Sequence, residues 1–262
     1  MRQGRTGKSE APRRILIFTR FLILAVCALR AVPAQSQLRM DWVRSGRKSP
    51  VGVSAGQFVQ WTSGDSGSAS SSTTYQDRKA TSGNLILVFS HWDNQALSAA
   101  VTDKLGNAYA SMGGPVNAGT TARFEAWYTK NIRGGVPLAV TVTYSGKTTS
   151  FSLVDAIEYS GLDRSAPLDV FASAAGSGTS QDSGPSPTTR ERNETLVGLI
   201  GYSVYSSPYT AGVGFLMRGY DASSMLEDRS VAEIGSYHAT ATSSRPDSWA
   251  AFVIGFKNAV QQ

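Results

Sequence analysis

Short segments in which apolar and polar residues alternate follow one another from Phe58 onward. In residues 121–129, Phe124, Ala126 and Tyr128 fall on one face of an extended chain, with Arg123, Glu125 and Trp127 on the other. Residues 84–92 are instead apolar at almost every position up to Ser90, which is typical of a central strand covered on both faces. Breaks at Gly, Asn, Ser and Pro separate these segments, so the pattern predicts short β-strands.

Further alternating segments occupy residues 138–144, 151–159, 168–172, 195–202, 214–218, 237–242 and 249–256. After residue 35 a helical period is not sustained over eleven residues, although residues 225–231 could form one short helical turn. About a dozen short strands at close spacing predict an all-β, antiparallel β-sandwich, jelly-roll-like in connectivity. We expect residues 56–258 to form this single domain after an N-terminal extension at residues 35–55.

Turn-forming residues predict how some of these segments connect. Residues 103–107 include Gly106 and Asn107, and they predict a hairpin between residues 100–102 and 108–111. Residues 62–74 and 174–189 are rich in Ser, Gly and Thr, and each lies between alternating segments. We therefore predict that these two stretches are long surface loops rather than linkers between domains.

The first 34 residues resemble an export signal. Seven Lys and Arg residues and a single acid lie in this stretch, which also contains an uninterrupted apolar run of nine residues. Val32 and Ala34 suit signal peptidase and predict cleavage before Gln35. Since nine apolar residues are too few to cross a bilayer, we expect a secreted, extracellular or periplasmic protein with no membrane span in the mature chain. The alternative is an uncleaved N-terminal anchor.

The charge distribution argues against nucleic-acid binding. The formal charge is +6, from 25 basic and 19 acidic residues. The first 34 residues contain seven of the basic residues and one of the acidic residues, so 18 of each sign remain after residue 34. A neutral body lacks the phosphate-neutralising charge that drives such binding. The single Cys and two His also make a structural zinc site improbable. We expect no cofactor. A structural calcium stays open, because scattered oxygen ligands leave no sequence signal outside an EF-hand loop.

Candidate catalytic groups do not converge. Residues 64–68 (GDSGS) look like the nucleophile segment of chymotrypsin-type proteases, but no His precedes Ser66, so we reject this match. A glycosidase needs two carboxyl groups at a set separation. Asp155 and Glu158 should point to opposite faces of a strand, as should the adjacent Glu227 and Asp228. We interpret residues 227–229 as a surface ion-pair or turn cluster.

Aromatic residues beside polar groups suggest a binding face instead. If the Phe124 face of residues 121–129 is core, then Trp127 faces solvent beside Arg123 and Glu125, and a flat exposed ring is what a sugar ring stacks on. Trp92, followed by Asp93 at a strand end, offers a similar pair. The alternative is that either Trp is buried beneath a loop, since Trp is highly buried on average.

Several spaced motifs carry a resemblance to a known type of domain. They are AWYTKNI at residues 126–132, EYSGLD at 158–163 with PLDV at 167–170, EDR at 227–229 and GSYHATAT at 235–242. Their order resembles a family of uncharacterised β-sandwich domains in secreted and surface proteins of bacteria, often found beside immunoglobulin-like or carbohydrate-active modules. The resemblance spans residues 56–257 and implies an extracellular domain. It assigns no functional residue.

Together these observations predict an exported, non-catalytic binding or cell-surface module whose partner is an extracellular polysaccharide or a surface glycan. The predicted ligand-binding residues are Trp127, Arg123, Glu125, Trp92 and Asp93. Two alternatives stay open. A polysaccharide-acting hydrolase or lyase would show a groove with two facing carboxylates. A structural or adhesive subunit would show a large exposed apolar patch or an unpaired edge strand.

Overall fold

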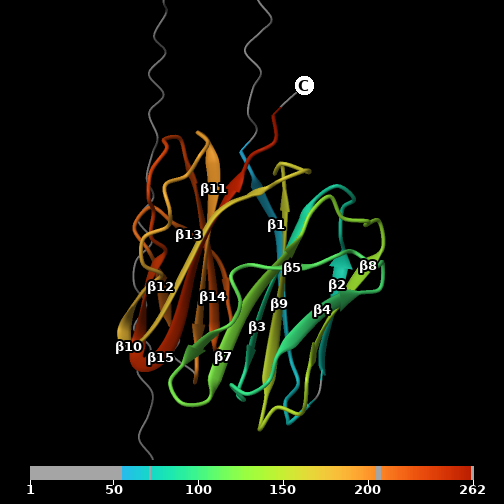
Figure 1. Cartoon of the computed structure of the whole chain (residues 1–262), viewed down its shortest axis with the longest axis vertical. Coiled ribbons are helices and arrows are strands. Elements are labelled where there is room, and N and C mark those ends of the chain that lie inside the picture. Colours follow the sequence, from blue (N-terminus) through green and yellow to red (C-terminus); the bar gives the residue numbers. More distant parts are fainter. Residues whose placement is uncertain (1–54, 71, 205–207, 261–262) are drawn as a thin grey trace, which may run out of the picture. The chain divides into compact units, whose positions relative to one another are not determined.

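The computed structural model describes residues 55–70, 72–204 and 208–260. This part of the chain contains fifteen strands, which form three antiparallel sheets (Figure 1). These ranges contain no helix, and so none that is long and apolar enough to cross a membrane. The predicted all-β, antiparallel sandwich is confirmed, while its jelly-roll connectivity stays a prediction. The predicted leader and residues 35–54 of the predicted extension lie outside the described residues.

The three sheets are layered, and we name them by position. The middle sheet has the order β1-β9-β3-β7-β5, with β6 also paired to β7. Its strands are β1 (Gln57–Asp65), β3 (Leu85–Trp92), β5 (Ala110–Ser111), β6 (Val116–Ala118), β7 (Ala122–Thr129) and β9 (Ser152–Ser160). On one side of it lies the small sheet, of order β2-β8-β4. The strands of the small sheet are β2 (Ser72–Lys79), β4 (Ala99–Asp103) and β8 (Pro137–Tyr144).

The outer sheet lies on the opposite side of the middle sheet (Figure 1). It has the order β10-β15-β11-β14-β13, with β12 also paired to β15. Its strands are β10 (Leu168–Asp182), β11 (Glu194–Tyr202), β12 (Tyr209–Ala211), β13 (Leu216–Tyr220), β14 (Ser224–Val231) and β15 (Thr240–Lys257).

The first hydrophobic core fills the space between the middle and outer sheets. Phe89 and Phe124 of the middle sheet and Phe252 of the outer sheet are each at most 1% exposed, and the rings of Phe89 and Phe252 meet edge to face at 5.3 Å. Gly201 in β11 allows this close approach, because a Cβ atom there would lie 2.2 Å from Phe124. Burying each such ring contributes about 1.5–3 kcal/mol to folding.

A second core lies between the middle and small sheets. It joins apolar side chains of β3, β7 and β9 to Leu138, Val140 and Val142 of β8, all three fully buried. Every residue of β3 is buried, as the apolar run at residues 84–92 predicts. The middle sheet is therefore covered on both faces, which explains why its central strand β3 carries no Asp, Glu, Lys or Arg.

The open side of the first core, between the edge strands β1 and β13, is closed by a polar network. Arg218 of β13 donates from Nε to both carboxylate oxygens of Asp228, each at 2.9 Å. The hydroxyl of Tyr159 donates to the same carboxylate at 2.8 Å, and the Arg218 guanidinium lies 5.4 Å from the centre of the Phe58 ring. Because Asp228 is buried, this pairing satisfies a charge that would otherwise be costly.

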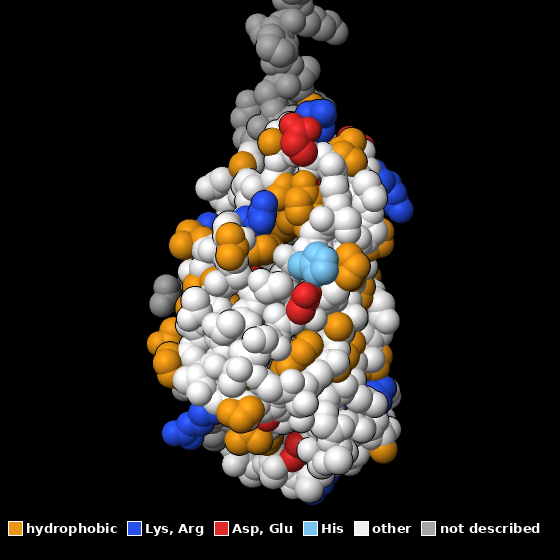
Figure 2. Space-filling view, turned by 90° about the vertical axis from the view of Figure 1, so that its left-hand side faces the viewer, with side chains coloured by type: hydrophobic (Ala, Val, Ile, Leu, Met, Phe, Trp, Pro, Cys, Tyr) orange, Lys and Arg blue, Asp and Glu red, His pale blue; other side chains and the backbone are white. Residues whose placement is uncertain are grey.

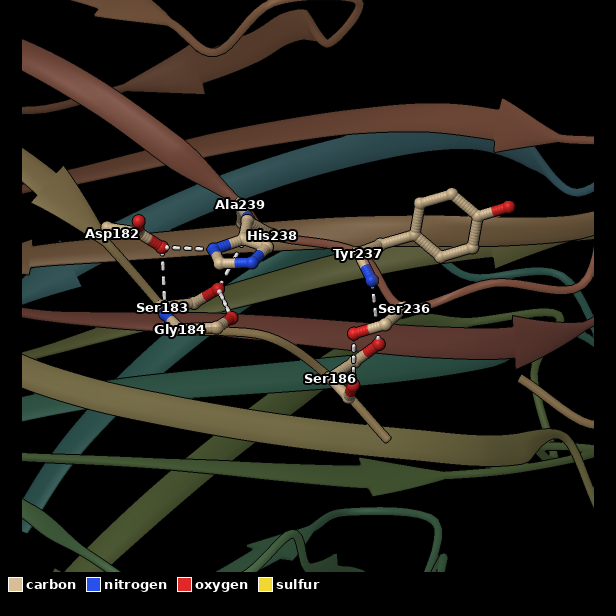
Figure 3. A network of polar contacts seen from close by, with 8 residues as sticks. All are labelled: Asp182, Ser183, Gly184, Ser186, Ser236, Tyr237, His238 and Ala239. Carbon is tan, nitrogen blue, oxygen red and sulfur yellow. Dashed lines mark hydrogen bonds and ion pairs between the residues drawn. The ribbon is translucent and has the colours of Figure 1, made fainter. Parts of the chain in front are cut away.

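Two segments cover part of the remaining face of the outer sheet. Residues 183–189 run beside residues 235–239, and backbone hydrogen bonds join Ser183 to Ala239 and Ser186 to Tyr237. Figure 3 shows the side chains that tie them together, among them the exposed His238, whose Nδ1 lies 2.8 Å from Asp182. Uncharged polar side chains and backbone cover most of the face seen in Figure 2, with several groups of hydrophobic side chains and scattered charged ones among them.

Three expectations about local structure are wrong. Residues 103–107 do not form a hairpin, because β4 pairs with β8 in the small sheet whereas β5 pairs with β7 in the middle sheet. Residues 225–231 belong to strand β14, not to a helical turn. Much of the two Ser-rich stretches is strand, since β1 extends to Asp65 and β10 to Asp182. Small polar residues form strands here because the sheet supplies their backbone partners.

Candidate functional site

The two tryptophans predicted to contact a ligand are buried. Trp127 is 4% exposed and Trp92 is fully buried, and both belong to the core between the middle and small sheets. The alternation in β7 is confirmed, since Phe124 and Ala126 face the other core. The expectation that Trp127 faces solvent is wrong, because the small sheet covers the second face of β7. The prediction of a glycan-binding surface around Trp127 assumed an exposed ring, and this ring is buried.

The polar residues predicted beside these rings serve local structure. Glu125 is buried and accepts a hydrogen bond from the Ser111 hydroxyl at 2.6 Å, and burial raises the pKa of its carboxyl group. Arg123 lies opposite Trp92 in the β3–β7 register and donates to the carbonyl oxygen of Gln95. The predicted residues therefore do not form one exposed face. Asp93 alone contacts a cavity wall.

That cavity lies between the middle and outer sheets, at the end of the sandwich where β1 finishes and β9 begins. Its volume is about 630 Å³, within the range of about 300–1,000 Å³ usual for small-molecule sites. Four chain segments line it, with the residues Ser63, Gly64, Asp65 and Gly67; Ser150, Phe151 and Leu153; Ser203 and Val204; and Asp221, Ala222 and Ser223. We call this cavity the end pocket.

Asp93 holds the wall that precedes β9. Its carboxylate accepts backbone hydrogen bonds from Thr149 at 2.8 Å, Ser150 at 2.6 Å and Phe151 at 3.3 Å, and another from the Ser150 hydroxyl. Burial by itself would raise the pKa of Asp93, but these hydrogen bonds outweigh it and leave the pKa below its ordinary value. An ionised Asp93 thus fixes Ser150 and Phe151 at the pocket.

Two further aspartates hold the walls contributed by the outer sheet. Asp247 accepts from the Ser203 hydroxyl and the Val204 backbone N–H, both at 2.7 Å. Asp221 accepts from the backbone N–H groups of Ser223 and Ser224, also at 2.7 Å. Each wall is therefore tied down by a carboxylate, so the pocket is formed before any ligand arrives.

A buried carboxyl group lies behind the pocket. Asp155 of β9 is 2% exposed, and it lies opposite Ser63 in the β1–β9 register. The Ser63 hydroxyl donates to Asp221 at 2.8 Å, and the Ser224 hydroxyl donates to Asp155 at 2.7 Å, whose Oδ1 has no partner among the described residues. Burial and the nearby charge of Asp221 raise the pKa of Asp155 well above its ordinary value, which favours its protonated form.

His91 supports the aromatic ring of the pocket. Its imidazole is fully buried, stacks on Phe124 at 4.2 Å and meets the Phe151 ring edge to face at 4.8 Å. Within the described part of the chain, neither of its ring nitrogens has a hydrogen-bond partner. Burial lowers the pKa of His91 to about 3, against a smaller opposing effect of Asp93 and Asp247, so the ring is neutral at physiological pH.

The other pairs of acids do not form a catalytic site. Asp155 faces the outer sheet, whereas Glu158 accepts from the Thr81 backbone at 2.9 Å, in keeping with their predicted opposite faces. Glu227 and Asp228 also point apart, but both are buried, so the surface cluster expected at residues 227–229 is wrong. In the described ranges, no three His, Cys, Asp or Glu side chains gather where they could hold a metal ion.

The sequence pattern did not predict the pocket, because its four walls come from segments that lie far apart in the chain. One signal was present in GDSGS at residues 64–68, whose Gly64, Asp65 and Gly67 line the pocket. The hydroxyl of Ser66 is engaged in the turn, since it accepts from the Ser152 backbone at 2.9 Å and donates to the Ser68 carbonyl at 2.7 Å. This segment is thus a wall of the pocket rather than a nucleophile.

The end pocket thus combines hydroxyl groups, carboxylates and one aromatic ring in a preformed cavity. Such groups suit a small ligand that both donates and accepts hydrogen bonds and has an apolar face. Comparison of the chain with family models, with curated proteins and with solved structures finds no match in any of the three.

Proposed function

We propose that the protein is an exported, non-catalytic module that binds a sugar unit of an extracellular glycan in the end pocket. The observation that carries this proposal is the pairing of the Phe151 ring with the hydroxyls of Ser63, Ser150 and Ser203 in one cavity. A sugar ring presents hydroxyl groups at its rim and C–H groups on its faces, so it uses both kinds of contact. The predicted leader and the resemblance to secreted β-sandwich domains support an extracellular location.

The preformed walls also favour binding. Hydrogen bonds to Asp93, Asp221 and Asp247 fix the backbone beside the serines and Phe151 in the unliganded protein. A ligand therefore loses little of its binding free energy to ordering the site.

A hydrolase is the weaker candidate. Retaining and inverting glycosidases place two carboxyl groups on either side of the scissile bond. Asp65 and Asp221 line the pocket, but the carboxyl group with the raised pKa belongs to Asp155, which lies behind Ser63 and is not part of the lining. The group best suited to act as an acid is thus not placed to reach a substrate.

A glycan-array screen of the full chain tests the proposal, followed by affinity measurements on two variants. Phe151→Ala removes the ring from the pocket. Phe215→Ala is the matched control, because Phe215 is also partly buried but lies beside Arg229 and outside the pocket. We expect Phe151→Ala to weaken glycan binding at least tenfold, as loss of a central aromatic contact does, and Phe215→Ala to leave it unchanged.

Two results would overturn the proposal. One is the absence of any glycan bound above background by the folded protein. The other is a Phe151→Ala variant that retains its fold, checked by circular dichroism, and binds the array hit with unchanged affinity.

A further inference from the structure

The charged side chains that line the end pocket in the described part of the chain are all acidic. Asp65 and Asp221 belong to its lining, and no Lys or Arg is among the described residues that line it. Asp93 and Asp247 lie directly behind two of the walls. Clefts lined by charges of one sign concentrate the field and attract ligands of the opposite sign. This bias is local, because the chain after residue 34 has as many basic as acidic residues.

The carboxylate oxygens in the lining are not all used as hydrogen-bond acceptors. The Asp65 carboxylate accepts no hydrogen bond from the described residues, and Oδ2 of Asp221 accepts one, from Ser63. A carboxylate has about four acceptor sites, so the lining offers more acceptors than its own donors fill. A ligand with a charged donor would fill them.

We propose that the end pocket selects a sugar bearing a protonated amine, that is, a glucosamine-type unit, over neutral and acidic sugars. This inference rests on the proposed function and names the class of sugar. An ammonium group supplies three donors and a positive charge, and its hydrogen bonds to carboxylates are about twice as strong as those between neutral groups. A uronic acid brings a carboxylate toward Asp65 and Asp221, and like charges at close range are unfavourable.

Three tetrasaccharides with the same linkage test the selection: β-1,4-linked glucosamine, glucose and glucuronate. Glucose replaces the amine with a hydroxyl of similar size, so it isolates the effect of charge. Binding is measured by calorimetry with the full chain at mildly acidic pH and low salt, where the amine is protonated. We expect glucosamine to bind about tenfold more tightly than glucose, glucuronate not to bind, and the preference to shrink as salt is added.

Asp65→Asn is the main variant, because Asp65 is exposed at the end of β1 and removal of its charge breaks no hydrogen bond in the described structure. Glu233→Gln is the matched control. Glu233 pairs with the exposed Arg192 just beyond the end of β14 that is distant from the pocket. Asp65→Asn should reduce the preference for glucosamine over glucose severalfold, because it removes a charge that only the amine would pair with. Glu233→Gln should change neither.

The outcomes separate the two proposals. Equal binding of glucosamine and glucose, or an unchanged preference in Asp65→Asn, overturns the amine inference and leaves the glycan-binding proposal standing. Binding abolished by a chelator also overturns the inference, because it would show that a metal ion and not an amine neutralises the carboxylates. If none of the three sugars binds and the array shows no hit, the proposed function itself fails.

Discussion

Trp127→Ala tests whether the small sheet covers the second face of β7. Trp127 is 4% exposed and lies opposite Val88 in the β3–β7 register, within the second core. A buried Trp removes about 200 Å² from water, which at about 25 cal/mol per Å² corresponds to about 5 kcal/mol. A compact unfolded chain and the retained Cβ reduce this figure, so we expect a loss of about 3–5 kcal/mol, the range seen for such substitutions.

Urea denaturation followed by far-UV circular dichroism measures this loss in the free energy of unfolding, independently of Trp fluorescence. Val213→Ala is the control, because Val213 is 95% exposed and its truncation should change stability by less than about 0.5 kcal/mol. The loss in the free energy of unfolding for Trp127→Phe should lie between the losses for Trp127→Ala and Val213→Ala. A loss below about 1 kcal/mol for Trp127→Ala, with an unchanged denaturant slope, would refute the burial of this face and restore the exposed-ring hypothesis.

Three further outcomes are expected. Burial raises the pKa of Glu194 to about 8 and that of Glu227 to about 7, so the folded protein holds protons that the unfolded chain releases above its own Glu pKa of about 4.3. Stability should therefore fall as pH rises from about 4.5 to 8, and Glu194→Gln with Glu227→Gln should flatten this fall. Asp93→Ala should loosen the wall before β9, seen as faster hydrogen exchange at the Phe151 amide. N-terminal sequencing of exported protein should begin at Gln35, and recovery of intact Met1 would contradict the predicted leader.

The alternation of residue types determined much of the secondary structure. It identified β3 and β7, and it assigned Phe124 and Trp127 to opposite faces, because side chains alternate strictly along a strand. It also showed that Asp155 and Glu158 could not form a pair. These properties depend only on neighbours in the chain.

Tertiary structure alone decided what covers each face. Trp127 is buried because β8, although it lies between β7 and β9 in the chain, pairs with β2 and β4 in a third layer instead of joining the middle sheet. Glu227 is likewise buried because Gly212 lies over it and donates to its carboxylate at 2.7 Å. Burial depends on long-range pairing, which a local period of two residues does not encode.

The end pocket illustrates the same division. Asp93 was recognised from the sequence as a polar residue at a strand end, but its partners at Ser150 and Phe151 lie more than fifty residues further along the chain. Asp221 and Ser63 meet across 158 positions. Sequence determined the chemistry of each wall, whereas the packing of two sheets determined that these walls enclose one cavity, because only the folded chain brings their ends together.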